Sequence, residues 1–386
     1  MKIQSRMVIL FIFLITVYSS INYYIGWHLT DWLDAVGISY SPWSFWIPFG
    51  IIAYGYILGR FRLPAVLLPA GRLLKVIGSY FIFFMEAAFL LFVLYDLIKL
   101  IVYATGSAMT DYSLYAGSAV VALLIVLFAI GSRNAWSPIV RQYELNIDKE
   151  PIPGGQVEWT VAVASDIHLG NTVGRKHLAK LVSRVNAMKP DLILLPGDVI
   201  DDSIEPYLRN RMGEVLGQLK SERGIYAVLG NHEYFGGHIE QYVAEMKKIG
   251  IQVLRDETVD IGGELSIAGR KDKTAESAEP SRRLGVNELI SSLDHAKPII
   301  LMDHQPTKFA AAAEAGADVM LSGHTHRGQF APNHLITKRL FELDWGYMRK
   351  GAMHVVVSSG FGSWGPPIRI GSRSEIIQLR ILLGNK

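Results

Sequence analysis

The sequence predicts two structural parts: four transmembrane helices at the N-terminus, followed by an α/β domain built from alternating strands and helices. The first observation is the uneven distribution of charge. The chain has 38 basic and 35 acidic side chains, and only 14 of these charged residues lie within residues 1–141. Four long apolar runs fall in the same region, whereas short apolar runs alternate with amphipathic stretches after Gln142. We therefore expect a transmembrane domain at residues 1–135 and a second domain at residues 136–386.

The four apolar runs of the first part are candidates for crossing a bilayer, whose hydrocarbon core needs about 20 apolar residues per helix. We expect the transmembrane helices at about residues 7–27, 43–59, 77–103 and 114–131. A cleaved signal peptide is the alternative for the first run, but the apolar core of such a peptide has only about 7–15 residues. The first run is longer and further apolar runs follow it, so a retained helix is favoured.

Basic residues near the helix ends predict the orientation, because Lys and Arg are enriched in cytoplasmic loops. They precede the first run, separate the second from the third, and follow the fourth: Lys2, Arg6, Arg60, Arg62, Arg72, Lys75, Arg133 and Arg141. We therefore expect a multi-pass protein of the cell membrane with both termini, and hence the second domain, in the cytoplasm. Glu86 and Asp96 fall within the third run, where an ionisable residue is a functional candidate; pairing or an interfacial position is the simpler explanation.

The overall composition excludes several classes of function. The net charge is only +3 at pH 7 and no block of Lys or Arg is present, which argues against nucleic acid as the main partner. The chain has no cysteine, so disulfides, thiolate metal ligands and cysteine nucleophiles are excluded.

The second part alternates short runs rich in Val, Ile and Leu with amphipathic stretches. Such runs are typical of strands covered on both faces, and the alternation predicts a layered α/β domain. We expect strands at 160–164, 192–195, 225–229, 265–268, 299–302, 319–321, 354–357 and 376–381, and helices at 176–188, 207–219, 239–248, 286–293 and 308–315. The polar segment 270–283 is expected to be a mobile loop.

Asp, Asn and His side chains directly follow five of the expected strands. The blocks are Ser165-Asp166-Ile167-His168, Gly197-Asp198-Val199-Ile200-Asp201-Asp202, Gly230-Asn231-His232-Glu233, Asp303-His304 and Ser322-Gly323-His324-Thr325-His326. Each block alone is weak, but ligands of α/β sheets bind at the carboxyl ends of strands, where these blocks would meet. Because clustered buried carboxylates and imidazoles are unfavourable without a cation, the combination predicts a metal site. Abundant imidazoles suit Mn, Fe or Zn better than calcium.

Together and in this order, the five blocks resemble the D-x-H, G-D-x-x-D, G-N-H-E, single-His and G-H-x-H signatures of the calcineurin-like metallophosphoesterase superfamily. The resemblance runs from about Val157 to Leu382. The stretch from Gly323 to Gln329 is similar to a bacterial branch that carries an N-terminal transmembrane anchor. The resemblance implies a fold of two facing β-sheets flanked by helices.

The resemblance also implies a site for two divalent metal ions. Asp166, His168 and His326 would hold the first ion. Asn231, His304 and His324 would hold the second ion, and Asp198 would bridge the two.

His232 would act as the general acid or contact the phosphate, and Asp201 would orient it. The simpler alternative is that His232 only supports Asn231. Some phosphoprotein phosphatases of the superfamily carry an Arg after the second Asp of G-D-x-x-D, where this chain has Asp202. This departure disfavours a phosphoprotein-phosphatase type of phosphate binding.

These features predict a membrane-anchored, dinuclear-metal phosphoesterase. We expect hydrolysis of a phosphodiester or pyrophosphate bond, with a lipid-linked substrate as one option, by attack of a metal-bridging hydroxide. Segment 335–349 mixes apolar and basic residues, so it could lie in an anionic headgroup region or pack on its own domain. A membrane-tethered nucleotide or cyclic-nucleotide phosphodiesterase is the alternative enzyme, and a membrane sensor or scaffold with a metal-binding module is the alternative of another class.

Overall fold

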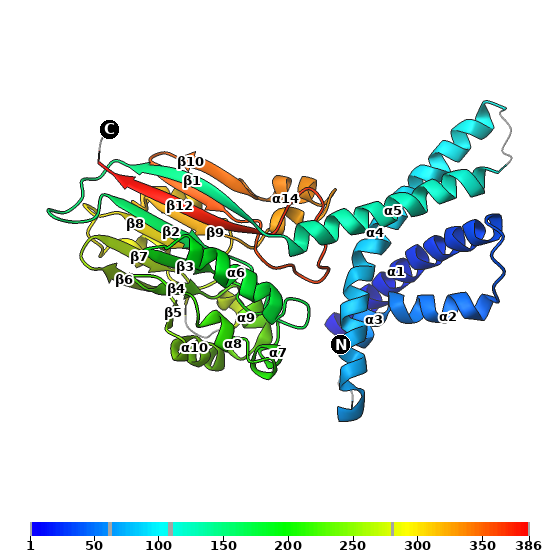
Figure 1. Ribbon diagram of the computed structural model, residues 1–386, viewed down its shortest axis with the longest axis horizontal. Helices are drawn as coiled ribbons and strands as arrows, with labels where there is room; N and C mark the ends of the chain where they lie inside the picture. The colour runs from blue at the N-terminus through cyan, green and yellow to red at the C-terminus, as the bar shows by residue number, and fades with distance from the viewer. Residues whose placement is uncertain (1, 61–63, 107–110, 279–281, 385–386) are drawn as a thin grey trace. The chain divides into compact units, whose positions relative to one another are not determined.

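The computed structural model describes residues 2–60, 64–106, 111–278 and 282–384. It divides into two compact units, Met1–Ile130 and Gly131–Lys386 (Figure 1). The first unit holds only helices, whereas the second holds all the strands.

Three helices of the N-terminal part are long and apolar enough to cross a membrane: α1 (Lys2–Ala35) from Met7 onward, α4 (Leu68–Ala104) and α5 (Tyr112–Trp136). The remaining elements are short: α2 (Pro42–Ala53), α3 (Gly55–Leu58) and the 3-10 turn η1 (Ala65–Leu67). The second expected helix, at 43–59, is therefore divided between α2 and α3. The 12 residues of α2 span only about 18 Å, less than the hydrocarbon core of a bilayer.

Glycines allow α3 to pack closely against α4. A Cβ atom on Gly78 of α4 would overlap the backbone of Tyr56, and one on Gly55 would lie 3.0 Å from the carbonyl oxygen of Leu74. Small residues of this kind let helix backbones approach closely in a membrane. α3 therefore lies directly against α4 as a separate short helix.

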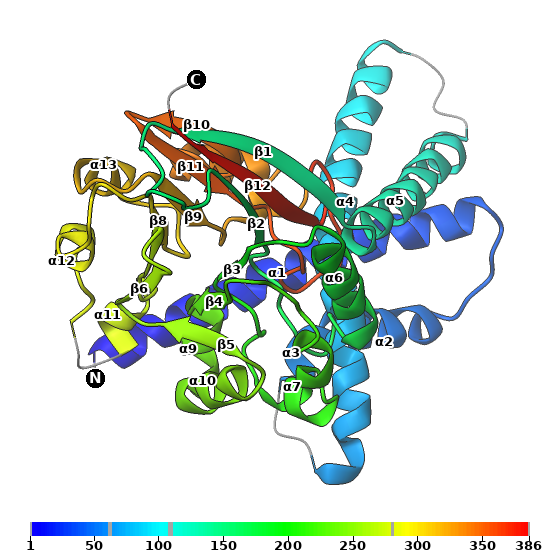
Figure 2. The same ribbon diagram turned by 60° about the vertical axis from the view of Figure 1, so that its left-hand side comes forward.

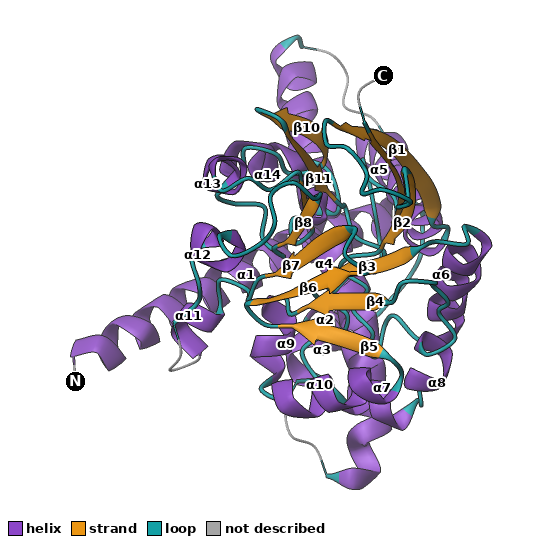
Figure 3. Cartoon of the chain, turned by 90° about the vertical axis from the view of Figure 1, so that its left-hand side faces the viewer, coloured by secondary structure: helices purple, strands orange, loops and turns teal. Residues whose placement is uncertain are grey.

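Two six-stranded sheets form the centre of the second unit (Figure 3). The first has the order β1 (Ile139–Ile147), β12 (Glu375–Leu383), β2 (Glu158–Val163), β3 (Leu192–Pro196), β4 (Ile225–Val228) and β5 (Ile251–Leu254). The second has the order β10 (Gly346–Lys350), β11 (Met353–Val357), β9 (Val319–Ser322), β8 (Ile299–Met302), β7 (Leu265–Gly269) and β6 (Glu257–Ile261). Two facing sheets, as implied by the resemblance, are confirmed.

Helices cover the outer face of each sheet (Figure 2). The helices that pack on the first sheet are α6 (Arg175–Ala187), α7 (Glu205–Arg209), α8 (Gly213–Leu216), α9 (Asn231–Gly236) and α10 (Ile239–Lys248). Later in the chain come α11 (Ala275–Ala278), α12 (Val286–Ile290), α13 (Phe309–Glu314), the 3-10 turn η2 (His326–Gly328) and α14 (His334–Leu340). Of these, α12 and α13 pack on the second sheet.

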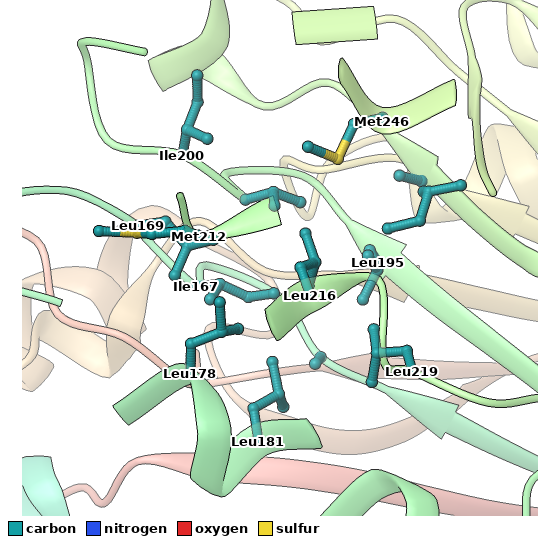
Figure 4. Packing of buried hydrophobic residues seen from close by; sticks show 14 of the residues in the cluster. Ile167, Leu169, Leu178, Leu181, Leu195, Ile200, Met212, Leu216, Leu219 and Met246 are labelled. Atoms are coloured by element: carbon teal, nitrogen blue, oxygen red, sulfur yellow. The ribbon is translucent and has the colours of Figure 1, made fainter. Parts of the chain in front are cut away.

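The buried strands are apolar on both faces because they separate two cores. In β3, Leu192 and Leu194 point between the sheets, whereas Ile193 and Leu195 point toward the helices. Figure 4 shows Leu195 in the core between the first sheet and its helices, together with leucines of α6 and α8. These two cores hold the strand ends, and hence the loops that follow them, in fixed positions.

In the second unit, four strands, three short helices and one helix break differ from the expectations. The strands β1, β5, β6 and β10 and the helices α9, α11 and α14 were not predicted. β1 alternates exposed residues with half-buried or buried ones and pairs with β12, more than 200 residues later. The helix expected at 207–219 is divided into α7 and α8, because Arg211 takes a left-handed conformation with φ 51°. The other expected elements differ from the structure mainly at their ends.

The expectation of a mobile loop at 270–283 is wrong for the two ends of that segment. Arg270 and Arg283 are buried, at 7% and 8% exposure, and both guanidinium groups contact the buried carboxylate of Asp303. Residues 279–281 lie outside the described part of the chain. This segment is therefore anchored to the residue that precedes His304.

Candidate metal centre

The five loops that follow β2, β3, β4, β8 and β9 bring their Asp, Asn and His side chains together. All seven residues expected to bind metal lie within a chain of side-chain contacts: Asp166, His168, Asp198, Asn231, His304, His324 and His326. Six of the seven are buried, and His324 is half-buried. Such a cluster is costly to bury unless a cation or internal pairing compensates it.

One group consists of Asp166, His168 and His326. The Nε2 atoms of His168 and His326 lie 3.0 Å apart, and Nε2 of His326 lies 3.5 Å from Oδ1 of Asp166. These donor atoms are close enough for one ion to contact all three side chains. Imidazole and carboxylate ligands of this kind suit Mn, Fe or Zn.

A second group surrounds the amide oxygen of Asn231. This oxygen lies 3.2 Å from Nε2 of His304 and 2.8 Å from Nδ1 of His324. The backbone carbonyl of Pro196 lies 2.8 Å from Nδ1 of His304 and can accept a hydrogen bond from its N–H. That contact leaves Nε2 of His304 as the ring nitrogen able to face a metal.

The carboxylate of Asp198 contacts both groups. Its Oδ2 atom lies 3.1 Å from Nε2 of His304 and 3.9 Å from Nε2 of His168. Its Oδ1 atom accepts a hydrogen bond of 3.0 Å from the backbone N–H of His232. One carboxylate oxygen of Asp198 therefore lies beside an imidazole of each group.

Backbone strain is concentrated in these loops. Five of the seven residues have a positive φ: Asp166 (53°), His168 (50°), Asp198 (53°), His324 (73°) and His326 (49°). A left-handed conformation at a non-glycine residue costs about 1–3 kcal/mol and persists only where its surroundings enforce it. Strain gathered in this way is typical of a functional site.

The glycines of the motifs are required by packing. A Cβ atom on Gly230 would overlap the carboxylate of Asp198, and one on Gly323 would overlap Asp166 and the hydroxyl of Ser165. Hydrogen bonds then connect the loops, since the N–H of His324 donates to Oδ1 of Asp166 at 2.9 Å. The signature glycines therefore allow the carboxylates to lie against neighbouring backbone.

Burial keeps most of the imidazoles neutral, which is the form that binds metal. It lowers the pKa of His168 to about 4 and the pKa of His324 to about 4. Burial also raises the pKa of Asp166 to about 6. Although burial acts in the opposite direction, the contact with His304 holds the pKa of Asp198 below its usual range. The donor set therefore fits divalent cations in both chemistry and burial.

His232 lies beside the first group, with its ring centroid 4.6 Å from that of His168. Its Nδ1 atom is 2.7 Å from Oδ1 of Asp202 and 3.5 Å from Oδ1 of Asp201. Burial lowers the pKa of His232, but the two carboxylates outweigh this effect and raise it to about 10. The ring is therefore held protonated, with Asp202 closer to it than the expected partner Asp201.

Several buried residues that the sequence did not single out support the loops. The carboxylate of Glu233 accepts backbone N–H groups of Asp198 (3.1 Å), Ile200 (3.0 Å) and Gly230 (2.7 Å). Arg369, which is fully buried, donates to the carbonyl oxygens of Gly360 (3.1 Å) and Gly362 (2.6 Å), and its Nη2 lies 3.4 Å from Nδ1 of His326. Glu233 stood within a motif, whereas nothing in the local sequence marks Arg369.

Comparisons with known proteins identify a family and several relatives of this chain. The family described as calcineurin-like phosphoesterase matches residues 160–328. An uncharacterized metallophosphoesterase of Aquifex aeolicus is 34% identical over 251 residues, which cover 63% of this chain and 92% of that protein.

Two further relatives are longer than the matched part of this chain. An uncharacterized metallophosphoesterase of Helicobacter pylori is 33% identical over 59% of this chain and 61% of its own length. A protein of Danio rerio described as a transmembrane protein with metallophosphoesterase domain is 33% identical over 67% of this chain and 62% of its own length. The chain thus spans about three fifths of these two relatives.

Proposed function

Because this chain belongs to the calcineurin-like metallophosphoesterase family, and is therefore a phosphoesterase hydrolase, we propose a membrane-anchored enzyme with two divalent metal ions that hydrolyses a phosphodiester or pyrophosphate bond. The family normally uses two divalent metals, and buried His and Asp groups of this chain could bind them. The observation that carries the dinuclear proposal is the position of Asp198, whose Oδ2 atom contacts a histidine of each group.

The proposed ligands follow from the two groups of contacts. Asp166, His168 and His326 would hold one ion. Asn231, His304 and His324 would hold the other, and Asp198 lies beside both groups of ligands. Such ions would supply activation of a water molecule and compensation of negative charge on the phosphoryl oxygens.

His232 supplies the proton in this proposal. Asp201 and Asp202 orient its ring and hold it protonated, so it can donate a proton to the leaving oxygen. The burial of His232 and its neighbours limits competing contacts with bulk water. No side chain has to act as a covalent nucleophile.

Three apolar helices could span a membrane, and we propose a cell-membrane location with the catalytic unit in the cytoplasm. The basic residues near the helix ends support this orientation. With three membrane crossings the two termini would lie on opposite sides of the bilayer. They lie on the same side only if the α2–α3 segment crosses as a fourth. A reporter fused after the C-terminus should therefore read as cytoplasmic; a reading on the opposite side would mean that three helices cross.

A lipid-linked phosphoester is the favoured substrate, because the enzyme is tied to a bilayer that would present it. The experiment is a screen of the full chain in nanodiscs, with added Mn, against a bis-aryl phosphodiester, phospholipids, polyprenyl pyrophosphates and nucleotides. The Asp198→Asn variant is the control for contaminating activity. Turnover of the lipid substrates above nucleotides supports the proposal. Bound metal with no turnover of any phosphoester would contradict it and favour a binding module.

A further inference from the structure

Helix α14 follows the last metal motif (Figure 1). It exposes apolar side chains with basic residues among them. Leu335, Ile336 and Leu340 are 62%, 59% and 72% exposed, and the helix contains no buried residue. Lys338 and Arg339 are also exposed. We call these five residues the α14 surface. Three exposed aliphatic side chains on seven residues of helix would be unfavourable in contact with water alone.

The α14 surface is fixed to the metal centre and is not a loose loop. The hydroxyl of Thr337 donates to Oδ2 of Asp344 at 2.6 Å, and the backbone carbonyl of Asp344 accepts a hydrogen bond from the hydroxyl of Thr325. Thr325 lies between His324 and His326 in the chain. Whatever contacts α14 is therefore held at a defined position relative to the proposed metal ligands.

Apolar side chains continue from α14 to the centre itself. The ring of Phe341, directly after α14, lies 6.0 Å from the ring of His324. On another loop, Phe235 is 63% exposed and its ring lies 5.8 Å from that of His232. Hydrocarbon therefore contacts both a proposed metal ligand and the proposed acid, as expected if the substrate carries apolar groups near its phosphate.

We infer that the α14 surface docks on an anionic bilayer, with Leu335, Ile336 and Leu340 among the acyl chains and Lys338 and Arg339 at the headgroups. Within the described part of the chain neither cation has an ion-pair partner, and anionic headgroups would supply one. The same chain has three helices that could cross a membrane, and these would attach it to a bilayer. This inference rests on the proposed function and extends it, because the phosphoester would be taken from that surface.

The chain contains no cysteine, so a single introduced thiol can be labelled specifically. The test places an environment-sensitive fluorophore on Ile336→Cys in the full chain, reconstituted in phosphatidylcholine–phosphatidylglycerol nanodiscs with or without nitroxide-labelled lipids. The matched control is Glu257→Cys. Glu257 is exposed on β6, at the opposite edge of the second sheet from β10, the strand that follows α14.

Docking predicts that nitroxide lipids cause a large loss of emission at position 336 and little loss at position 257. Lys338→Glu with Arg339→Glu should reduce the loss at 336. Equal quenching at the two positions would overturn the inference. So would a blue-shifted emission at 336 in detergent that lipid does not change, since it would mean that α14 packs on protein. Quenching without turnover would reject only the proposed function, and turnover without quenching would reject only the docking.

Discussion

Oδ1 of Asp202 lies 2.7 Å from Nδ1 of His232, closer than Oδ1 of Asp201 at 3.5 Å. Asp202 is also the position at which the chain departs from the phosphoprotein-phosphatase pattern. The departure therefore has a structural consequence, because the proposed general acid gains a second carboxylate.

Asp202→Asn should shift the alkaline limb of the pH–rate profile to lower pH. The two carboxylates raise the pKa of His232 to about 10 in the protein without metal, so they favour the protonated ring. Removing the closer charge lowers the pKa, and the active protonated form is lost earlier as pH rises. Asp201→Asn is the matched comparison and should shift the limb in the same direction, because both carboxylates raise the pKa of His232. Identical profiles for wild type and both variants would exclude His232 as the acid.

His232→Ala should keep the metals and slow turnover by about 10²–10⁴-fold, the range for loss of a general acid. The ring of His232 contacts His168, but His232 is not one of the seven proposed ligands. Metal analysis of the purified variant, together with single-turnover kinetics, separates the two roles. Loss of metal from His232→Ala would show that this residue is a ligand or supports one.

Gly323→Ala should disrupt the first metal group, because the new methyl group would overlap Asp166 and Ser165. Overpacking of this kind costs about 1–3 kcal/mol, and here it would displace a proposed ligand. Gly174→Ala is the control, since no atom lies within 4 Å of the position that a Cβ atom would take there and its φ of −105° suits any residue. Thermal unfolding and metal content should change for Gly323→Ala only. A normal metal content in that variant would contradict the packing argument.

Arg369→Lys should weaken metal binding by about 10–100-fold, as expected for a residue that orients a ligand. Lysine cannot reach the carbonyl oxygens of Gly360 and Gly362 and Nδ1 of His326 in the same geometry. Arg373→Lys, on the same loop, is the control, because Arg373 donates to the carbonyl oxygen of Ser137 instead. Equal metal affinities for the two variants, measured by competition with a chelator, would reject this role for Arg369.

The layered fold and the clustering of the five Asp, Asn and His motifs could be predicted, because both depend on patterns within short stretches of sequence. β3 is apolar on both faces, and the strand ends in the glycine and carboxylate of Gly197-Asp198. The expected membership of the calcineurin-like metallophosphoesterase family is likewise confirmed. The ligand roles of the seven residues stay predictions until metal is measured.

The supporting contacts could not be predicted, because they join residues far apart in the chain. β1 reaches its partner β12 across more than 200 residues, and only two of its nine residues are buried. The sequence around Arg270 and Arg283 is polar and therefore suggested a loop. Only in the folded chain does the carboxylate of Asp303 contact both guanidinium groups. The close approach of α3 to α4 at Gly55 and Gly78 likewise joins two separate apolar runs of the chain.

The central claim is that one aspartate, Asp198, joins two metal ions. Electron paramagnetic resonance of the manganese-loaded full chain, with the metal content of the same sample, tests it most directly. We predict two manganese ions per chain with a spin-coupled spectrum, and the loss of both ions and of activity in Asp198→Asn. A single ion per chain, or two ions without magnetic coupling, would contradict the account.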